Sequence, residues 1–257
     1  MSSFRGLARP RPGSAAREVA VLLILAAGAW AATLALTRGM AGATGTMGLG
    51  LAAFVAVWTL MMAAMMLPSV APTASLYAKT FRDNRALRIA GLVAGYLAVW
   101  VAAGLPAYGF AWLAGWLTGE HPTAAHVMAV TVFAVCGVYQ LSSLKDRCLA
   151  HCRSPLGLLL HYGSYRGRSR DLRVGAHHGG YCLGCCWALM VILIAVGVMN
   201  VAAMLGLAAL VLVEKLWARG PLAGRLAGVA ALALAAATIW LPWLAPGLHS
   251  APVMMMN

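Results

Sequence analysis

The chain alternates between long apolar runs and short segments rich in basic residues. The apolar runs cover, approximately, Val19 to Thr37, Leu51 to Val70, Ile89 to Leu117, Ala125 to Leu144, Tyr181 to Val213 and Leu226 to Leu244. A helix needs about 20 apolar residues to cross the hydrocarbon core of a bilayer, and none of these runs alternates as the strands of a membrane barrel do. The pattern therefore predicts an all-α fold, a polytopic transmembrane helical bundle in contact with the lipid bilayer.

The run from Tyr181 to Val213 is too long for one comfortable span and barely long enough for two. Gly197 and Asn200 lie near its middle and favour a tight turn there. If the run folds as a hairpin, the bundle has about seven spans, whereas one long tilted helix would give about six.

The charge distribution favours the hairpin. The chain has 19 Lys and Arg against 6 Asp and Glu, for a net charge of +13, and the basic residues lie between the apolar runs. If the Arg-rich N-terminus is cytoplasmic, a hairpin brings Lys215, Arg219 and Arg225 to the cytoplasmic side, as the positive-inside rule expects. Glu214 is expected to pair with Lys215 at the membrane boundary. Since no basic stripe carries interleaved aromatic residues, nucleic acid is not an expected partner.

The composition, 62% hydrophobic, leaves no room for a soluble module, so we expect one folding unit with polar ends. The basic segment 1–18 is expected to be disordered, residues 19–247 to form the transmembrane metal-binding domain, and residues 248–257 to form a Met-rich tail. The run that begins at Val19 is longer than a signal-peptide core and has no clear small-residue cleavage site. It is therefore predicted to be an uncleaved span.

Five of the six cysteines lie close together, in two groups on either side of the longest polar segment. Each group is a triad with i, i+3, i+4 spacing, which places its three side chains on one face of a helix. Two histidines stand just before the second triad. The candidate metal ligands in this region are Cys148, His151, Cys152, His177, His178, Cys182, Cys185 and Cys186.

Thiolate and imidazole are the ligands of copper(I) and zinc, and such sites are usually built from pairs of close ligands. The alternative is packing, because free Cys is often a small buried hydrophobe, and this is the expected role of Cys136, alone in its span. Structural disulfides are disfavoured on the reducing cytoplasmic side, whereas a redox pair at Cys182 and Cys185 stays open. Two matched triads favour metal ligation over packing.

A methionine cluster lies in the second apolar run, where Met61, Met62, Met65 and Met66 form two i, i+4 pairs on adjacent helix faces. Thioethers suit copper(I) and need no deprotonation inside a membrane, so Met62 and Met66 are candidate ligands. The alternative is that these methionines fill gaps between helices. Pro68 is expected to break or kink the helix.

Three strings of the sequence resemble a known family of bacterial membrane proteins. They are MMAAMMLPS at Met61–Ser69, LKDRCLAHCRSPL at Leu144–Leu156 and HHGGYCLGCCWALMVILIAVGVMN at His177–Asn200, followed by Glu214-Lys215-Leu216. The family is the domain-of-unknown-function family 2182, described as predicted metal-binding integral membrane proteins, with some members labelled copper chaperones. The resemblance covers roughly Leu51 to Arg219, and it implies binding of a metal, copper above all, through Cys148, Cys152, Cys182, Cys185 and Cys186.

We therefore expect a multi-pass protein of the bacterial inner (plasma) membrane that handles copper(I) as a carrier, chaperone or transporter. Zinc is the alternative metal, and a protein that donates or accepts the metal is a further expected partner. The rival from another class is an enzyme, either a membrane thiol oxidoreductase or a metal-dependent enzyme that uses the same cysteines. No cysteine occurs in segments assigned to the outer side, which counts against the oxidoreductase. A purely structural subunit would leave the cysteine triads unexplained.

Overall fold

The structure, a computed structural model, describes residues 14–40, 44–81, 84–154, 157, 162 and 165–249. Within these ranges the chain is all helical and has no strand, which confirms the predicted fold class. The helices are α1 (Ser14–Met40), α2 (Leu51–Lys79), α3 (Arg85–Glu120), α4 (Pro122–Gln140), α5 (Ser143–Cys152), α7 (Arg170–Val196), α8 (Val201–Leu216) and α9 (Gly220–Trp240), with the short 3₁₀ helices η1 (Pro242–Leu244) and η2 (Pro246–Leu248).

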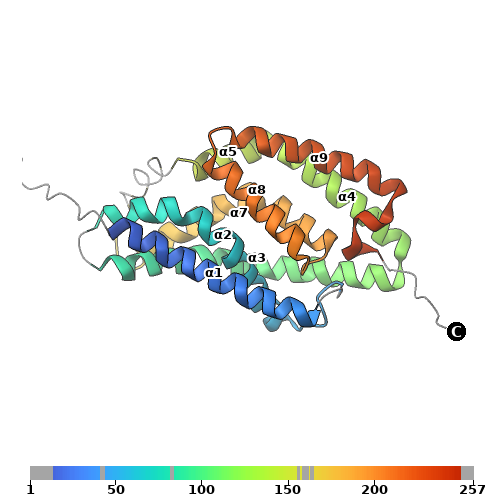
Figure 1. Cartoon of the computed structure of the whole chain (residues 1–257), viewed down its shortest axis with the longest axis horizontal. Helices are drawn as coiled ribbons and strands as arrows, with labels where there is room; N and C mark the ends of the chain where they lie inside the picture. The colour runs from blue at the N-terminus through green and yellow to red at the C-terminus, as the bar shows by residue number, and fades with distance from the viewer. Residues whose placement is uncertain are drawn as a thin grey trace, which may run out of the picture.

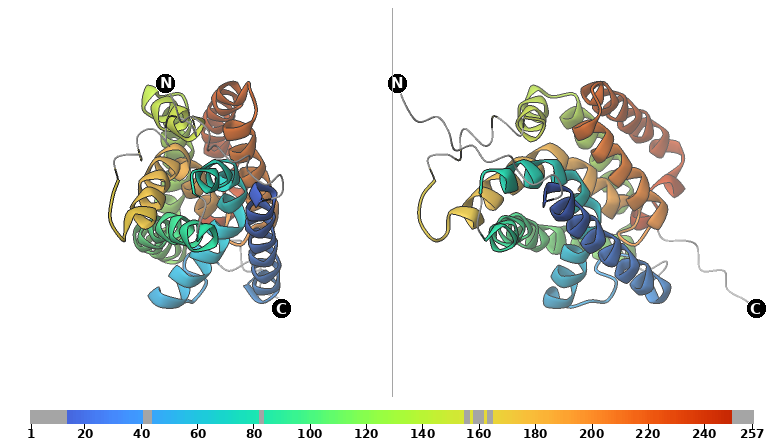
Figure 2. Two further views of the ribbon diagram at one scale, coloured as in Figure 1. Left: turned by 90° about the vertical axis from the view of Figure 1, so that its left-hand side faces the viewer. Right: turned by 60° about the vertical axis from the view of Figure 1, so that its left-hand side comes forward.

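Of the described helices, six are long and apolar enough to cross a membrane, namely α1, α2, α3, α4, α7 and α9. Figure 1 shows the longer helices extending roughly along the long axis of the molecule. Seen from the end of the bundle, α1 and α9 lie at its periphery (Figure 2). Helix α7 is the most enclosed, since 61% of its most apolar stretch is buried against 22% in α1. The centre of the bundle is therefore the region around α7.

The predicted turn near Gly197 and Asn200 is present, whereas a crossing of the membrane by α8, which is not among the six candidate spans, stays a prediction. Helix α7 ends at Val196 and α8 begins at Val201, so the turn falls at Gly197 to Asn200. Gly197 adopts a φ of 105°, which glycine tolerates best, and the Asn200 side chain caps α8 by accepting the backbone N–H of Ala203 at 3.0 Å. Helix α8 has 16 residues, which gives a length of about 24 Å, so it is shorter than the candidate spans.

Several boundaries differ from those expected from hydropathy. Helix α1 begins at Ser14 rather than Val19, and α7 begins at Arg170 rather than Tyr181. Pro68 does not end α2, which continues through it to Lys79. Polar residues can extend a membrane helix beyond the apolar core, because its backbone bonds form within the segment. Residues 1–13 of the basic N-terminal segment and 250–257 of the Met-rich tail lie outside the described residues.

Helices α3 and α7 approach each other closely at glycine positions. A side chain at Gly95 of α3 would collide with the backbone of Leu172 and Ala176, and one at Gly175 of α7 would collide with the backbone of Leu92. Small residues allow helix backbones to come this close, and the gain is van der Waals packing over a long contact. The contact fixes α7, the central helix, against α3.

We expect Gly95→Ala to destabilise the fold, because the added methyl group must push two helix backbones apart. Overpacking of this kind costs about 1–3 kcal/mol, so the Tm of the purified protein in detergent should fall by several degrees. Gly109→Ala on the same helix is the control, since its methyl group would meet nothing within 4 Å. Equal thermal stability of the two variants would contradict a close α3–α7 contact.

Candidate metal centre

Four cysteines from two helices form a buried group, called the thiol cluster below: Cys152, Cys182, Cys185 and Cys186. The three members on α7 are at most 1% exposed. The thiols of Cys185 and Cys186 donate to the carbonyl of Cys182 at 3.1 and 2.8 Å. Helix α5 contributes Cys152, whose Sγ atom lies 3.9 Å from that of Cys185. The two triads predicted from spacing therefore meet through one thiol of each.

The position of Cys152 depends on how α5 is held. Ser142 caps the start of α5, where its hydroxyl accepts a backbone N–H at 3.3 Å. Just beyond the end of α5, the Arg153 guanidinium donates to the carbonyls of Glu214 and Trp217 at the end of α8, the latter at 2.7 Å. Carbonyls at a helix end lack partners within their own helix, so Arg153 caps α8 and fixes the end of α5 at once.

A lysine near the end of α8 points into the thiol cluster. The Nζ atom of Lys215 donates to the Sγ atom of Cys182 at 2.9 Å and to the Oγ atom of Ser69 on α2 at 3.1 Å. The hydroxyl of Tyr96 on α3 lies 2.9 Å from the same sulfur. Helices α2, α3, α7 and α8 therefore meet at Cys182. The sequence analysis connected neither Lys215 nor Tyr96 with Cys182, and it did not connect Ser69 with Lys215.

The expected pair between Glu214 and Lys215 is wrong. The Oε1 atom of Glu214 instead lies 2.6 Å from the Nζ atom of Lys145 on α5, and both side chains are 1% exposed. The ammonium group of Lys145 also donates to the amide oxygen of Gln140. Adjacent positions on a helix do not face each other, so Glu214 and Lys215 enter different networks. This spacing rule was the available signal that Lys215 had another partner.

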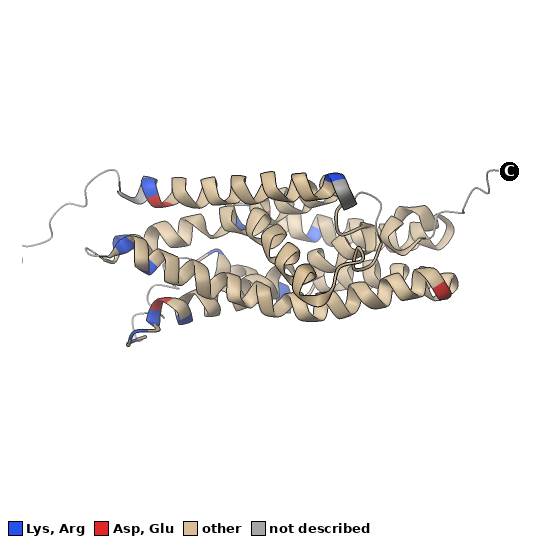
Figure 3. Cartoon of the chain, turned by 90° about the horizontal axis from the view of Figure 1, so that it is seen from below, with Lys and Arg blue, Asp and Glu red and all other residues tan. Residues whose placement is uncertain are grey.

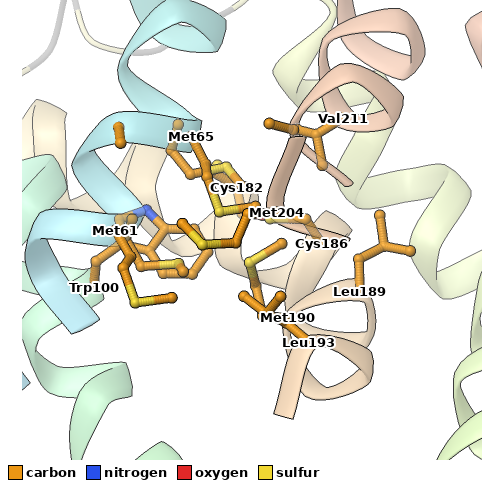
Figure 4. Packing of buried hydrophobic residues seen from close by; sticks show 14 of the residues in the cluster. Met61, Met65, Trp100, Cys182, Cys186, Leu189, Met190, Leu193, Met204 and Val211 are labelled. Atoms are coloured by element: carbon orange, nitrogen blue, oxygen red, sulfur yellow. The ribbon is translucent and has the colours of Figure 1, made fainter. Parts of the chain in front are cut away.

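Methionine side chains of α2 and α8 lie in the region of the thiol cluster (Figure 4). Figure 4 shows Met61 and Met65 of α2 and Met204 of α8 in the same region as Cys182 and Cys186. All four methionines of the α2 cluster are fully buried. The other pair predicted from sequence, Met62 and Met66, follows Met61 and Met65 by one residue each, so its side chains leave the helix about 100° further round. That pair stays a prediction.

The candidate histidines separate into two groups. The rings of His151 and Tyr181 stack with centroids 3.6 Å apart, and the Nδ1 atom of His177 shares a hydrogen bond of 2.9 Å with the hydroxyl of Tyr162. These two histidines belong to an aromatic group between α5 and α7. His178 is 2% exposed instead, and its Nδ1 atom has no hydrogen-bond partner among the described residues. A buried unpartnered imidazole nitrogen is a donor available to a metal.

The remaining cysteines differ in their surroundings. Cys148 is half-buried on α5, and its Sγ atom lies against Gly184. Burial raises the pKa of the Cys148 thiol, and the nearby Cys185 raises it further. The hydrogen bond to Cys185, together with burial, raises the pKa of the Cys152 thiol well above its usual range. Cys136 donates to the carbonyl of Ala188 at 3.0 Å.

Within the described ranges, no three His, Cys, Asp or Glu side chains stand in an arrangement that could hold a metal ion. The eight predicted Cys and His ligands therefore do not converge on one closed site of the zinc type, in which a tetrahedral set of N and S ligands surrounds the ion. What the fold brings together is a close pair of thiols, further thiols one helical turn away, and uncharged thioethers. This donor set is soft throughout.

Residues 55–238 match the sequence model of a family described as a copper chaperone (PpoB2). The matched range includes both cysteine triads, the methionine cluster of α2 and all of α8. No curated protein and no solved structure matches the chain.

Proposed function

Because the chain belongs to this copper chaperone family, we propose that it is a multi-pass membrane protein that binds copper(I) and hands it to a partner protein. The observation that carries the proposal is the contact between Cys152 and Cys185, whose Sγ atoms lie 3.9 Å apart. Copper(I) is a soft cation that favours thiolates. A buried thiol pair contributed by two different helices suits this cargo. A shift of either helix would change the distance between the two sulfur atoms and so the affinity for the ion.

The thiols and thioethers have different proposed roles. The thiol cluster holds copper(I), since thiolates are its stronger ligands and must lose their protons to bind it. The thioethers of Met61, Met65 and Met204 bind more weakly and carry no charge, so they suit transfer of the ion to and from the thiols. His178 supplies a nitrogen donor on the same helix.

The orientation follows from charge. Figure 3 shows most Lys and Arg gathered toward one end of the bundle, with few at the other. By the positive-inside rule, we infer that the basic end faces the cytoplasm and that the N-terminus is inside. Copper(I) would then be bound by the thiols on the reducing side of a bacterial inner membrane, where thiols stay reduced.

We expect a Cys152→Ser, Cys185→Ser variant to lose most copper(I) binding, because a hydroxyl has nearly the size of a thiol but is a poor ligand for a soft ion. Copper content per protein, measured by elemental analysis after anaerobic loading, should fall to near background. Cys136→Ser is the matched control, since that thiol only donates to a carbonyl, and it should load like the wild type. Equal loss of copper in the control would mean that the fold, and not the thiol pair, was damaged.

Variants of the α2 methionines distinguish a copper carrier from an enzyme. Met61→Leu with Met65→Leu should slow copper(I) transfer to an added chelator about tenfold or more while leaving the equilibrium copper content unchanged, because Leu keeps the volume but removes the sulfur. Met62→Leu with Met66→Leu, one residue further along the same helix, tests the other predicted pair by the same measurement. A thiol oxidoreductase would instead oxidise dithiols without added metal, and neither pair of Met→Leu changes would affect copper(I) transfer. These two results together would contradict the carrier proposal and support an enzyme.

The proposed seven-span topology, in which α8 crosses the membrane, determines which ends of the chain share a side. Between Arg168 and the C-terminus the chain passes through α7, α8 and α9, so a reporter inserted near Arg168 and one fused after Asn257 should lie on opposite sides. We expect the first to read as cytoplasmic and the second as periplasmic. Two cytoplasmic readings would mean that α8 does not cross the membrane.

A further inference from the structure

The side chain of Lys215 carries a basic group that is buried inside the bundle. It is 8% exposed, and none of the ion pairs among the described residues includes it. The other buried lysine, Lys145, has Glu214 as its counter-ion at 2.6 Å. Burial of an uncompensated charge is costly, so the ammonium group of Lys215 requires negative charge nearby.

The neighbours of Lys215 show where that negative charge can come from. Its Nζ atom donates to a thiol, Cys182, and to a hydroxyl, Ser69. Cys182 is joined to the rest of the thiol cluster through its carbonyl, which accepts from Cys185 and Cys186. The ammonium group of Lys215 is thus hydrogen-bonded to one member of the thiol cluster, whose cysteines can become thiolates.

The formal charges of the loaded cluster depend on the metal. Copper(I) held by two thiolates leaves one negative charge, and the ammonium of Lys215 cancels it. A divalent ion on the same two thiolates is already neutral, so the ammonium leaves one positive charge in a buried site. Since net charge in the interior is penalised, the first arrangement is favoured and the second is not.

We propose that Lys215 sets the metal preference of the thiol cluster, because its fixed positive charge favours a monovalent soft cation over a divalent one. The proposal rests on copper binding by the thiol cluster as proposed above. Lys215 is a positioning residue and not a ligand, because an ammonium group has no lone pair to offer a metal.

The test compares metals of different charge on purified protein in detergent, with the affinity of each measured by anaerobic competition with a chromophoric chelator. Lys215→Gln keeps a hydrogen-bond donor but removes the charge. It should weaken copper(I) binding on the order of 100- to 1,000-fold, because a unit charge about 4–6 Å away is worth this much at an effective dielectric constant of about 20. Zinc(II) binding should be unchanged or stronger. Lys215→Arg keeps the charge and should keep the wild-type preference.

Lys79→Met is the matched control, because Lys79 is exposed at the end of α2, and its metal affinities should equal those of the wild type. If Lys215→Gln weakens both metals to the same extent, or neither, Lys215 has only a structural role and the proposal fails. Wild-type protein that binds no copper(I) at all would instead overturn the proposed function.

A second measurement needs no variant. Silver(I) and cadmium(II) are both soft, but only silver(I) is monovalent. Silver(I) should displace copper(I) from the wild-type protein at near-equal concentration, whereas cadmium(II) should need a large excess. Displacement by cadmium(II) as readily as by silver(I) would overturn the proposal even if the Lys215 variants fail to fold.

Discussion

The close contact between α3 and α7 is the constraint on which the rest of the structure depends. Helices in a membrane gain little from burying apolar surface, so their association relies on van der Waals packing at short range. Gly95 and Gly175 allow the two backbones to meet without side chains between them. Tyr96 follows Gly95 directly, and this brings its hydroxyl to the Sγ atom of Cys182 at 2.9 Å. The contact between α3 and α7 therefore also sets the position of Tyr96 beside Cys182.

The charged side chains near the thiol cluster are held in different ways. Lys145 and Glu214 neutralise each other at 2.6 Å, which is the usual condition for charges deep inside a bundle. Arg153 satisfies the free carbonyls at the end of α8. Lys215, the other buried lysine of the described residues, donates instead to the thiol of Cys182 and the hydroxyl of Ser69. The contrast sets the thiol cluster apart from the rest of the interior.

Hydropathy and spacing predicted the helical class, the hairpin at Gly197 and the grouping of cysteines, because these depend on local chemistry along one helix or turn. The neighbours of each cysteine could not be predicted, because they come from helices far apart in the sequence. Spacing grouped His151 with Cys152, yet the ring of His151 stacks on Tyr181. Figure 4 shows Met61 and Met65 in the region of Cys182 and Cys186, and the role of Met62 and Met66 stays a prediction. Periodicity identifies a face of a helix but not what that face meets.

The adjacency of Glu214 and Lys215 on α8 has a mechanical consequence. One residue is tied to α5 through Lys145, and the next is tied to α7 through Cys182. A rotation of α8 by one residue would break both ties together, since neighbouring side chains turn as a unit about the helix axis. The ion pair between Glu214 and Lys145 therefore fixes the rotation of α8 about its axis, and this keeps the ammonium group of Lys215 directed at the Sγ atom of Cys182.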